Sequence, residues 1–188
     1  MLYLASQSPR RAELLQQIGI DFRTAPVDID ESPIAGESPE EYVKRLSIAK
    51  AEACRAIYPN NPTLGSDTAV ILDQQILGKP RDKDQAITML MSLAGREHQV
   101  LTGVALALTQ TSYRLSKTNV RFRHISHDEA INYWHSGEPA DKAGGYAIQG
   151  LGAIFVENIA GSYSGVMGLP LFETAELLQE LEIFNSLT

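Results

Sequence analysis

Ten consecutive residues from Thr63 to Leu72, TLGSDTAVIL, constrain the fold of this chain more than any other segment. Apolar or small residues stand at nearly every position rather than at every second one. That pattern is typical of a β-strand covered on both faces. Strand and helix signals alternate on either side of this run, so the sequence predicts a mixed α/β fold.

The remaining elements are expected from periodicity and from capping signals. Ser8 precedes Pro9 at the start of a first helix, and Ser38 and Ser126 each begin a capping box. The helix from Ser38 is expected to present Tyr42, Leu46, Ala49 and Ala53 on one face. Expected strands are 2–5, 22–27, 63–72, 99–108 and 114–124; expected helices are 9–18, 38–57, 82–95 and 126–134, and a last one after Pro170. No stretch resembles a linker, so residues 1–188 are expected to form a single domain.

Charge and cysteine content exclude several classes of protein. A net charge of −7 leaves no pervasive basic face for a nucleic-acid backbone. One cysteine, Cys54, rules out an internal disulfide and fits a reducing compartment. Arginines interrupt the early apolar run, which argues against a signal peptide, and the uncharged stretches are too short for a membrane span. We therefore expect a soluble, cytoplasmic protein without nucleic-acid or membrane partners.

Asp67 is the strongest candidate for chemistry because it lies inside the apolar run. A buried carboxylate is costly unless it is paired, hydrogen-bonded or bound to a metal. Gly65, two residues earlier, is expected to leave space for a ligand beside it. The alternative is that this end of the strand simply reaches solvent at Ser66 and Asp67.

Arginines in the first turn of the first helix indicate an anion site. Arg10 and Arg11 oppose the positive end of the helix dipole unless an anion docks there. Backbone N–H groups, the hydroxyls of Ser6 and Ser8, and two guanidinium groups would then converge on a phosphate. A solvated helix start with both arginines in water is the alternative.

Three further residues are weaker candidates when each is taken alone. Lys79 follows the apolar strand, and Pro80 makes the turn rigid enough to give the lysine a defined direction. A solvated loop lysine fits the same position equally well. Lys50 lies among alanines in a helix and could project toward the same cleft, but a surface lysine is the simpler interpretation. Glu31 belongs to an acidic turn that could bind a divalent cation or could simply be solvated.

Glycines concentrate between Gly137 and Gly168, which hold eight of the fourteen in the chain. Within this segment Gln149 lies between apolar residues and glycine, so we expect its amide to face a pocket. An amide that both donates and accepts suits the edge of a nucleobase. Tyr146 could stack on a base or pack in the core. The segment lacks the Walker and dinucleotide-binding patterns, and the histidines show no metal-binding spacing.

Taken together and in order, these segments resemble the Maf family of nucleoside triphosphate pyrophosphatases. The matching stretches are Leu4–Arg11, Asp30-Glu31, Leu64–Thr68, Leu77–Asp82, Asp141–Gly152 and Gly161–Leu171. The Ser-Pro-Arg-Arg and Ile-Gln-Gly forms look like the branch that acts on dTTP and UTP, not the branch associated with 7-methyl-GTP.

The resemblance implies a two-lobed α/β fold around a central cleft, similar to the inosine triphosphate pyrophosphatases, with residues 1–188 as one Maf-like domain. It implies a hydrolase that converts the triphosphate to the monophosphate and pyrophosphate. Asp67 matches the proton acceptor. Residues matching substrate-choice positions are Arg11 (or Arg10), Thr68 and Gln149, and further cleft positions match Glu31, Lys50 and Lys79.

From these residues we expect the following mechanism. Arg10, Arg11, Lys50, Lys79 and Lys142 offset the charge of the triphosphate, while Asp67 and Glu31 bind Mg²⁺, Mn²⁺ or Co²⁺. Asp67 accepts the proton of the water that attacks the α-phosphorus. The resemblance is compatible with a homodimer. The alternative function is a non-catalytic, nucleotide-binding regulator of cell division.

Overall fold

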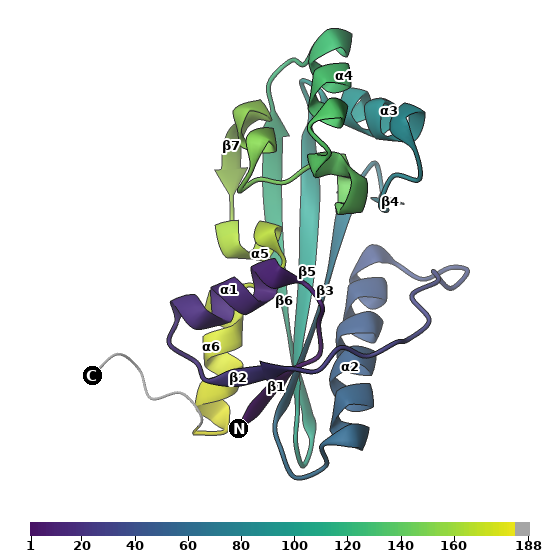
Figure 1. Cartoon of the computed structure of the whole chain (residues 1–188). Helices are drawn as coiled ribbons and strands as arrows, with labels where there is room; N and C mark the ends of the chain where they lie inside the picture. The colour runs from purple at the N-terminus through teal and green to yellow at the C-terminus, as the bar shows by residue number, and fades with distance from the viewer. Residues whose placement is uncertain (183–188) are drawn as a thin grey trace. The chain divides into compact units, whose positions relative to one another are not determined.

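The computed structural model describes residues 1–182, which form a seven-stranded mixed sheet and six α-helices (Figure 1). The strands are β1 (Leu2–Leu4), β2 (Phe22–Thr24), β3 (Thr63–Leu72), β4 (Gln75–Leu77), β5 (Glu97–Ala107), β6 (Thr111–Phe122) and β7 (Val156–Ala160). The helices are α1 (Pro9–Gln17), α2 (Pro39–Ile57), α3 (Lys83–Leu93), α4 (His127–His135), α5 (Tyr163–Met167) and α6 (Leu171–Glu180). None of these helices combines the length and apolar character needed to cross a membrane.

The sheet combines parallel and antiparallel pairing. Its strand order is β2-β1-β3-β5-β6-β7, and β4 pairs with β3 outside this path. Strand β1 runs parallel to both β2 and β3, whereas β4 is antiparallel to β3 and β7 is antiparallel to β6. A mixed sheet with helices between its strands confirms the predicted α/β class.

The predicted elements are confirmed, with three additions. Both capping boxes, Ser38 with Glu41 and Ser126 with Glu129, form as expected. Strand β2 is shorter than predicted, and β4, β7 and α5 were not foreseen. The β3–β4 turn explains the first omission, because its two central residues, Asp73 and Gln74, have φ of 50° and 66°. Hairpin turns of this kind usually carry Asn-Gly or Asp-Gly, and Asp-Gln gives no such signal.

The described chain forms two compact units. Unit 1 comprises residues 1–67, 102–116 and those from 168 onward, and unit 2 comprises residues 68–101 and 117–167. Strands β3, β5 and β6 each contribute residues to both units.

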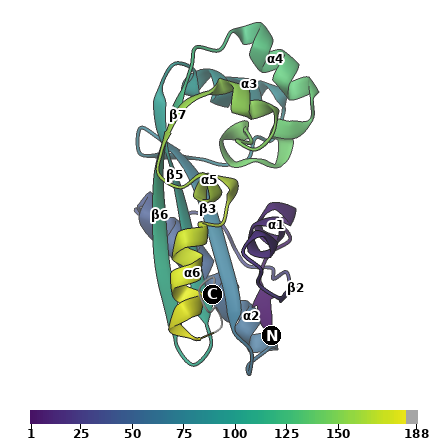
Figure 2. The same cartoon turned by 90° about the vertical axis from the view of Figure 1, so that its left-hand side faces the viewer.

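In unit 1, helices α2 and α6 lie on opposite faces of the strands, as the two perpendicular views show (Figures 1 and 2). Gly65 sets how closely α2 approaches β3. A Cβ at this position would lie 2.3 Å from the Ser47 carbonyl oxygen and 2.5 Å from the Ala51 nitrogen. The space beside Gly65 is therefore filled by the backbone of α2. The expectation that it is left for a ligand is wrong.

The buried face of α2 also differs from the predicted one. Of the expected set Tyr42, Leu46, Ala49 and Ala53, only Leu46 is buried. The helix is turned so that two polar residues face inward, and each makes hydrogen bonds, Ser47 within α2 itself and Lys50 with a residue of β3. Ser47 donates to the Val43 carbonyl at 2.8 Å, and Lys50 binds a carboxylate of β3 at 2.6 Å. The buried residues of α2 are Pro39, Val43, Leu46, Ser47, Lys50, Ala51 and Cys54.

Unit 2 has an apolar core formed by strand residues and by helices α3 and α4. Phe122 lies at its centre and contacts the rings of His98, Tyr146 and Phe155. Tyr146 is buried and its hydroxyl lies 2.8 Å from His98 Nε2. Of the two fates expected for Tyr146, packing in the core is the one observed.

Candidate active site

The centre of the candidate site is a group of three charged side chains in unit 1. Lys50 Nζ lies 2.6 Å from Asp67 Oδ1 and 2.7 Å from Glu31 Oε1. The side chains of Lys50 and Asp67 are 10% and 9% exposed, whereas that of Glu31 is 51% exposed. Asp67 is therefore buried, as predicted, and the simple interpretation of Lys50 as a surface lysine is wrong.

The positions of nearby residues on β3 and α2 explain why Lys50 reaches Asp67. Gly65 and Asp67 point to the same face of β3 because strand side chains alternate. Lys50 lies one helical turn after Ser47, on the same side of α2. Because Gly65 lets α2 approach closely, the lysine ammonium reaches the carboxylate two residues further along the strand.

The electrostatic environment of Asp67 is suited to a proton acceptor. Burial raises the pKa of the Asp67 carboxyl above its usual range, and the positive charges of Lys50 and Arg11 oppose that shift. A carboxylate with a raised pKa is a stronger base than an exposed one, provided that nearby cations keep it ionised.

Arg11, rather than Arg10, is directed toward this centre. Its Nε donates to the Gly168 carbonyl at 2.7 Å, and its Nη1 donates to Ser6 Oγ at 3.3 Å. Desolvation lowers the pKa of the Arg11 guanidinium, and the negative charge of Asp67 counteracts this. Arg11 and Asp67 thus act on each other electrostatically.

The N-terminus of α1 keeps features of an anion site. Ser8 occupies the N-cap position, but among the described residues its side chain makes no capping hydrogen bond. The Ser8 amide donates instead to Ser6 Oγ at 3.1 Å. First-turn N–H groups without a side-chain cap are suited to an anion.

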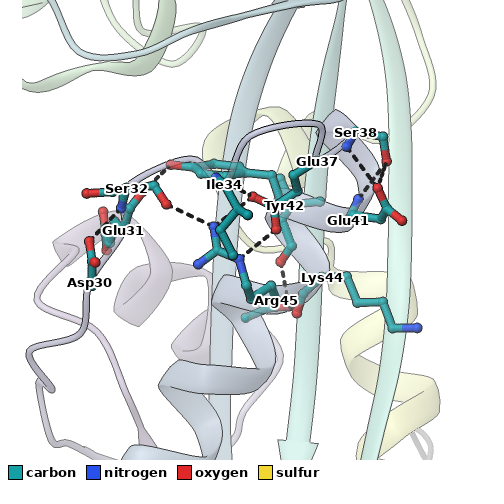
Figure 3. A network of polar contacts seen from close by, with 12 residues as sticks. Asp30, Glu31, Ser32, Ile34, Glu37, Ser38, Glu41, Tyr42, Lys44 and Arg45 are labelled. Carbon is teal, nitrogen blue, oxygen red and sulfur yellow. Dashed lines mark hydrogen bonds and ion pairs between the residues drawn. The ribbon is translucent and has the colours of Figure 1, made fainter.

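Glu31 is carried by a loop that two residues of α2 fasten in place (Figure 3). Arg45 makes two hydrogen bonds to the Glu37 carboxylate, at 2.6 and 2.8 Å, and a third to the Ser32 carbonyl at 3.1 Å. The Tyr42 hydroxyl donates to the Glu31 carbonyl at 3.1 Å. Desolvation, together with the charges of Asp67 and Glu31, raises the pKa of Tyr42 to about 12, so the phenol stays a donor.

The two carboxylates fit a divalent cation that also has ligands from a substrate. Within residues 1–182 no group of three or more His, Cys, Asp or Glu side chains is gathered around one point. Glu31 and Asp67, however, each place an oxygen within 2.7 Å of the same ammonium nitrogen. Mg²⁺ is commonly held by one or two carboxylates together with phosphate oxygens, which matches this donor set.

The other predicted residues belong to unit 2. Lys79 is exposed, and Lys142 forms an ion pair with its neighbour Asp141. Gly144 N donates to the Gly78 carbonyl at 3.0 Å, so the segments that carry these two lysines lie side by side. Thr68 is half-buried in β3.

Gln149 is exposed in the structure, whereas its apolar neighbours suggested an enclosed amide. The backbone around it is nevertheless fixed. Glu138 accepts hydrogen bonds from the Tyr133 hydroxyl at 2.6 Å and from the amides of Leu151 and Gly152 at 2.9 and 3.0 Å. A Cβ at Gly150 would lie 2.1 Å from the Glu138 carboxylate, so a larger residue there would displace the carboxylate from its hydrogen bonds.

Sequence reasoning missed the residues that support the site, namely Tyr42, Arg45, Glu37 and Glu138. Glu138 could have been found from its position in the glycine-rich segment, at the first residue of a short helical turn, Glu138–Asp141. Arg45 and Glu37 carry no local signal, because a charged pair eight residues apart is not a recurrent motif.

Comparisons with known proteins identify the family of this chain. A model of the family described as Maf-like protein matches residues 1–181. The dTTP/UTP pyrophosphatase of Saccharophagus degradans is 54% identical over 97% of this chain and 89% of its own length. Those of Alkalilimnicola ehrlichii and Pseudoalteromonas translucida are 50% and 53% identical, over 97% and 95% of this chain and 93% and 95% of theirs.

Among solved structures, the Ham1 protein of Staphylococcus aureus overlaps with a TM-score of 0.48 at 14% identity, over 64% of this chain and 71% of that one. We draw no conclusion about this chain from a structural similarity with so low a TM-score and sequence identity. The family model spans nearly all of the described residues, and relatives share half of the sequence over almost its full length. The chain belongs to the Maf family.

Proposed function

We propose that this chain hydrolyses dTTP and UTP to the nucleoside monophosphate and pyrophosphate. Its relatives named dTTP/UTP pyrophosphatase are 50–54% identical over nearly the whole chain. The observation that carries the proposal is the buried Asp67 carboxylate beside the Lys50 ammonium and under the influence of Arg11. A protein that only binds nucleotides has no need of a basic carboxylate among cations.

The phosphate chain binds at the N-terminus of α1, in unit 1. Ser6, Ser8 and the first-turn amides of α1 offer donors to the phosphates, and Arg10 and Arg11 offset their charge. Lys50, Lys79 and Lys142 are assigned to the same task. Phosphoryl transfer depends on positioning and charge neutralisation more than on covalent catalysis.

Asp67 takes the proton of the attacking water. The water oxygen bonds to the α-phosphorus, the bond from that phosphorus to the bridging oxygen breaks, and pyrophosphate leaves with the bond's electron pair. Glu31 and Asp67 would hold a divalent cation, Mg²⁺, Mn²⁺ or Co²⁺, which neutralises phosphate charge and lowers the pKa of a bound water.

Gln149 and Thr68 are assigned to base selection. The Gln149 amide can donate to O4 and accept from N3–H of uracil or thymine. Replacing Gln149 by leucine is expected to lower the preference for dTTP and UTP over purine triphosphates, measured as the ratio of kcat/KM values. An unchanged ratio would remove Gln149 from the proposal.

Two further parts of the proposal concern the whole chain. Residues 1–188 act as one Maf-like catalytic domain in the cytoplasm, and a homodimer is compatible with this function. A regulatory protein that binds nucleotides without hydrolysing them is the competing function.

The deciding experiment compares wild type and Asp67→Asn for pyrophosphate release from dTTP with Mg²⁺. The substitution should lower kcat by about 10²–10⁴-fold, because a neutral amide cannot accept the proton. Asp73→Asn, at an exposed ion pair with Arg96, is the matched control and should keep full activity. No pyrophosphate from wild type would favour the regulatory function, and full activity of Asp67→Asn would refute the role of Asp67.

A further inference from the structure

One ammonium group serves two carboxylates at the centre of unit 1. Lys50 Nζ lies 2.6 Å from Asp67 Oδ1 and 2.7 Å from Glu31 Oε1. At these distances the nitrogen binds both oxygens at once, so it occupies the position from which a single cation contacts both carboxylates. The Lys50 ammonium thus contacts both carboxylates as a bound metal cation would.

A divalent cation would compete with Lys50 for this position. Asp67 and Glu31 each carry one negative charge, and together with Lys50 they form a group of net charge −1. Two positive centres cannot share the same pair of oxygens closely, because like charges in a poorly solvated site repel strongly. Binding of a divalent cation to both carboxylates therefore requires the lysine ammonium to move away.

We propose that in the free protein the Lys50 ammonium occupies the position of the divalent cation between Asp67 and Glu31. When the cation binds, the ammonium moves away and binds the substrate phosphates instead. This inference rests on the proposed function for the identity of the final ligand. The first half, competition between Lys50 and the cation, concerns only the residues of this chain.

The surroundings of the three groups support this exchange. Asp67 is fixed in the middle of β3, and Lys50 is on a helix packed tightly against Gly65. The backbone of Glu31 is fastened through Tyr42, but its side chain is half exposed. Asp67 therefore stays in place, while the four-carbon side chain of Lys50 and the half-exposed side chain of Glu31 can change rotamer without a movement of α2.

The ion pair with Lys50 also explains how the free protein tolerates a buried Asp67. Removing one partner of a buried ion pair leaves an uncompensated charge, which is strongly destabilising. With Lys50 in place, Asp67 is neutralised before any metal or nucleotide arrives. In the absence of nucleotide, the wild-type protein should consequently bind divalent cations weakly.

The test measures binding of Mn²⁺ alone, by titration calorimetry and by the Mn²⁺ dependence of the melting temperature. Lys50→Met removes the ammonium and should bind Mn²⁺ about tenfold or more tightly than wild type, since no positive group then lies between the Asp67 and Glu31 oxygens at the position of Lys50 Nζ. Lys50→Arg keeps the charge and should bind as weakly as wild type. Lys44→Met, at an exposed position of the same helix, is the matched control and should also match wild type.

The double variant Lys50→Met with Glu31→Gln shows whether the same oxygens are involved, and it should lose the gain. Equal Mn²⁺ affinity of Lys50→Met and wild type would overturn the proposal. If Lys50→Met folds only with Mn²⁺ added, that dependence supports competition. If it stays unfolded with and without Mn²⁺, the cation fails to replace the ammonium and the proposal is refuted.

A second measurement uses the wild-type protein and tests the transfer to phosphate. The side-chain ¹⁵N resonance of Lys50 should be unchanged by Mg²⁺ alone and should shift on addition of Mg²⁺ with a non-hydrolysable dTTP analogue. A bound analogue that leaves this resonance unchanged contradicts the transfer. If the analogue does not bind at all, the proposed function fails, while the Mn²⁺ titrations of the variants still decide the competition.

Discussion

At the scale of single residues, Asp67 and His98 are both buried, but their surroundings favour opposite charge states. Asp67 is stabilised as a charge by Lys50 and Arg11. His98 has no counter-charge of this kind, and burial lowers its pKa to about 4. Its Nε2 lies 2.8 Å from the Tyr146 hydroxyl, and within residues 1–182 its Nδ1 has no hydrogen-bond partner. His98 is therefore kept neutral in the folded state.

We predict that His98 makes unit 2 sensitive to mild acid. The pKa of His98 is about 4 in the folded chain against 6.5 ordinarily, so the unfolded chain binds the proton first as the pH falls. The free energy of unfolding should fall by about 3 kcal/mol between pH 6.5 and pH 4, with no effect of His98 above that window. Urea unfolding followed by Trp134 fluorescence measures this, because the single tryptophan lies in unit 2.

The double variant His98→Phe, Tyr146→Phe should show a flatter pH dependence in that window, because it removes both polar partners together. His127→Gln, at an exposed histidine, is the matched control and should keep the wild-type slope. The ion pair of Glu129 with Arg123 titrates lower, since the pKa of Glu129 is lowered to about 2 mainly by hydrogen bonding to Arg123. A wild-type slope in the double variant would refute the role of His98.

At the scale of elements, helix α2 organises most of unit 1. Its inward face carries Lys50 to Asp67, and its N-terminal half fastens the loop before it through Tyr42 and Arg45 (Figure 3). The planar Arg45 guanidinium matches the Glu37 carboxylate with two parallel bonds, which fixes a direction as well as a distance. A loop of acidic and small residues thereby acquires a defined conformation.

We predict that Arg45→Met loosens this loop and impairs catalysis with little loss of global stability. Without the guanidinium, the Glu31 carboxylate is held less well, and kcat/KM for dTTP should fall by about tenfold through misplacement. Hydrogen–deuterium exchange of residues 28–37 should speed up in parallel. Arg45→Lys should recover little of the activity, since an ammonium cannot make the parallel pair of bonds.

Arg114→Met is the matched control for that experiment. It breaks another exposed arginine cluster of unit 1, with Glu176 and Glu180, and should leave kcat/KM and the exchange of residues 28–37 unchanged. Unchanged exchange in Arg45→Met would show that the loop does not depend on the guanidinium.

At the scale of the whole molecule, an acidic chain of net charge −7 is proposed to bind a highly anionic substrate. Overall charge does not attract such a substrate, so in this proposal recognition depends on the local group of Arg10, Arg11, Lys50 and the α1 amides. Binding that depends on a few local cations and a metal should be visible as stabilisation of the folded state.

We predict that dTTP with Mg²⁺ stabilises the Asp67→Asn variant, which keeps the arginines but cannot consume the ligand. At a hundredfold excess over Kd the gain is about 2.7 kcal/mol, or about 5–10 °C in the melting temperature for a chain of this size. Calorimetric melting scans measure the shift, with dGTP as the comparison ligand expected to give a smaller one. No shift with dTTP would show that the nucleotide does not bind.

Most elements could be predicted from the sequence because their signals are local. The nearly continuous run of apolar and small residues gave β3 with its predicted bounds, and Ser38 with Glu41 and Ser126 with Glu129 marked two helix starts. The burial of Asp67 followed from its apolar neighbours alone. Elements with no such signal were missed, as the Asp73-Gln74 turn before β4 illustrates.

By itself, then, the sequence determined the order of most strands and helices, the α/β class and the buried aspartate. The resemblance to a family suggested Lys50, Glu31 and Arg11 as neighbours of that aspartate, but the tertiary structure alone decided how they contact it. Lys50 among alanines looked like a surface residue, and nothing local revealed that α2 turns it inward or that Arg45 fastens the loop of Glu31. Helix rotation and ion pairing are settled by contacts between residues far apart in the chain, because burying a charge is favourable only where the fold brings its partner within hydrogen-bond distance.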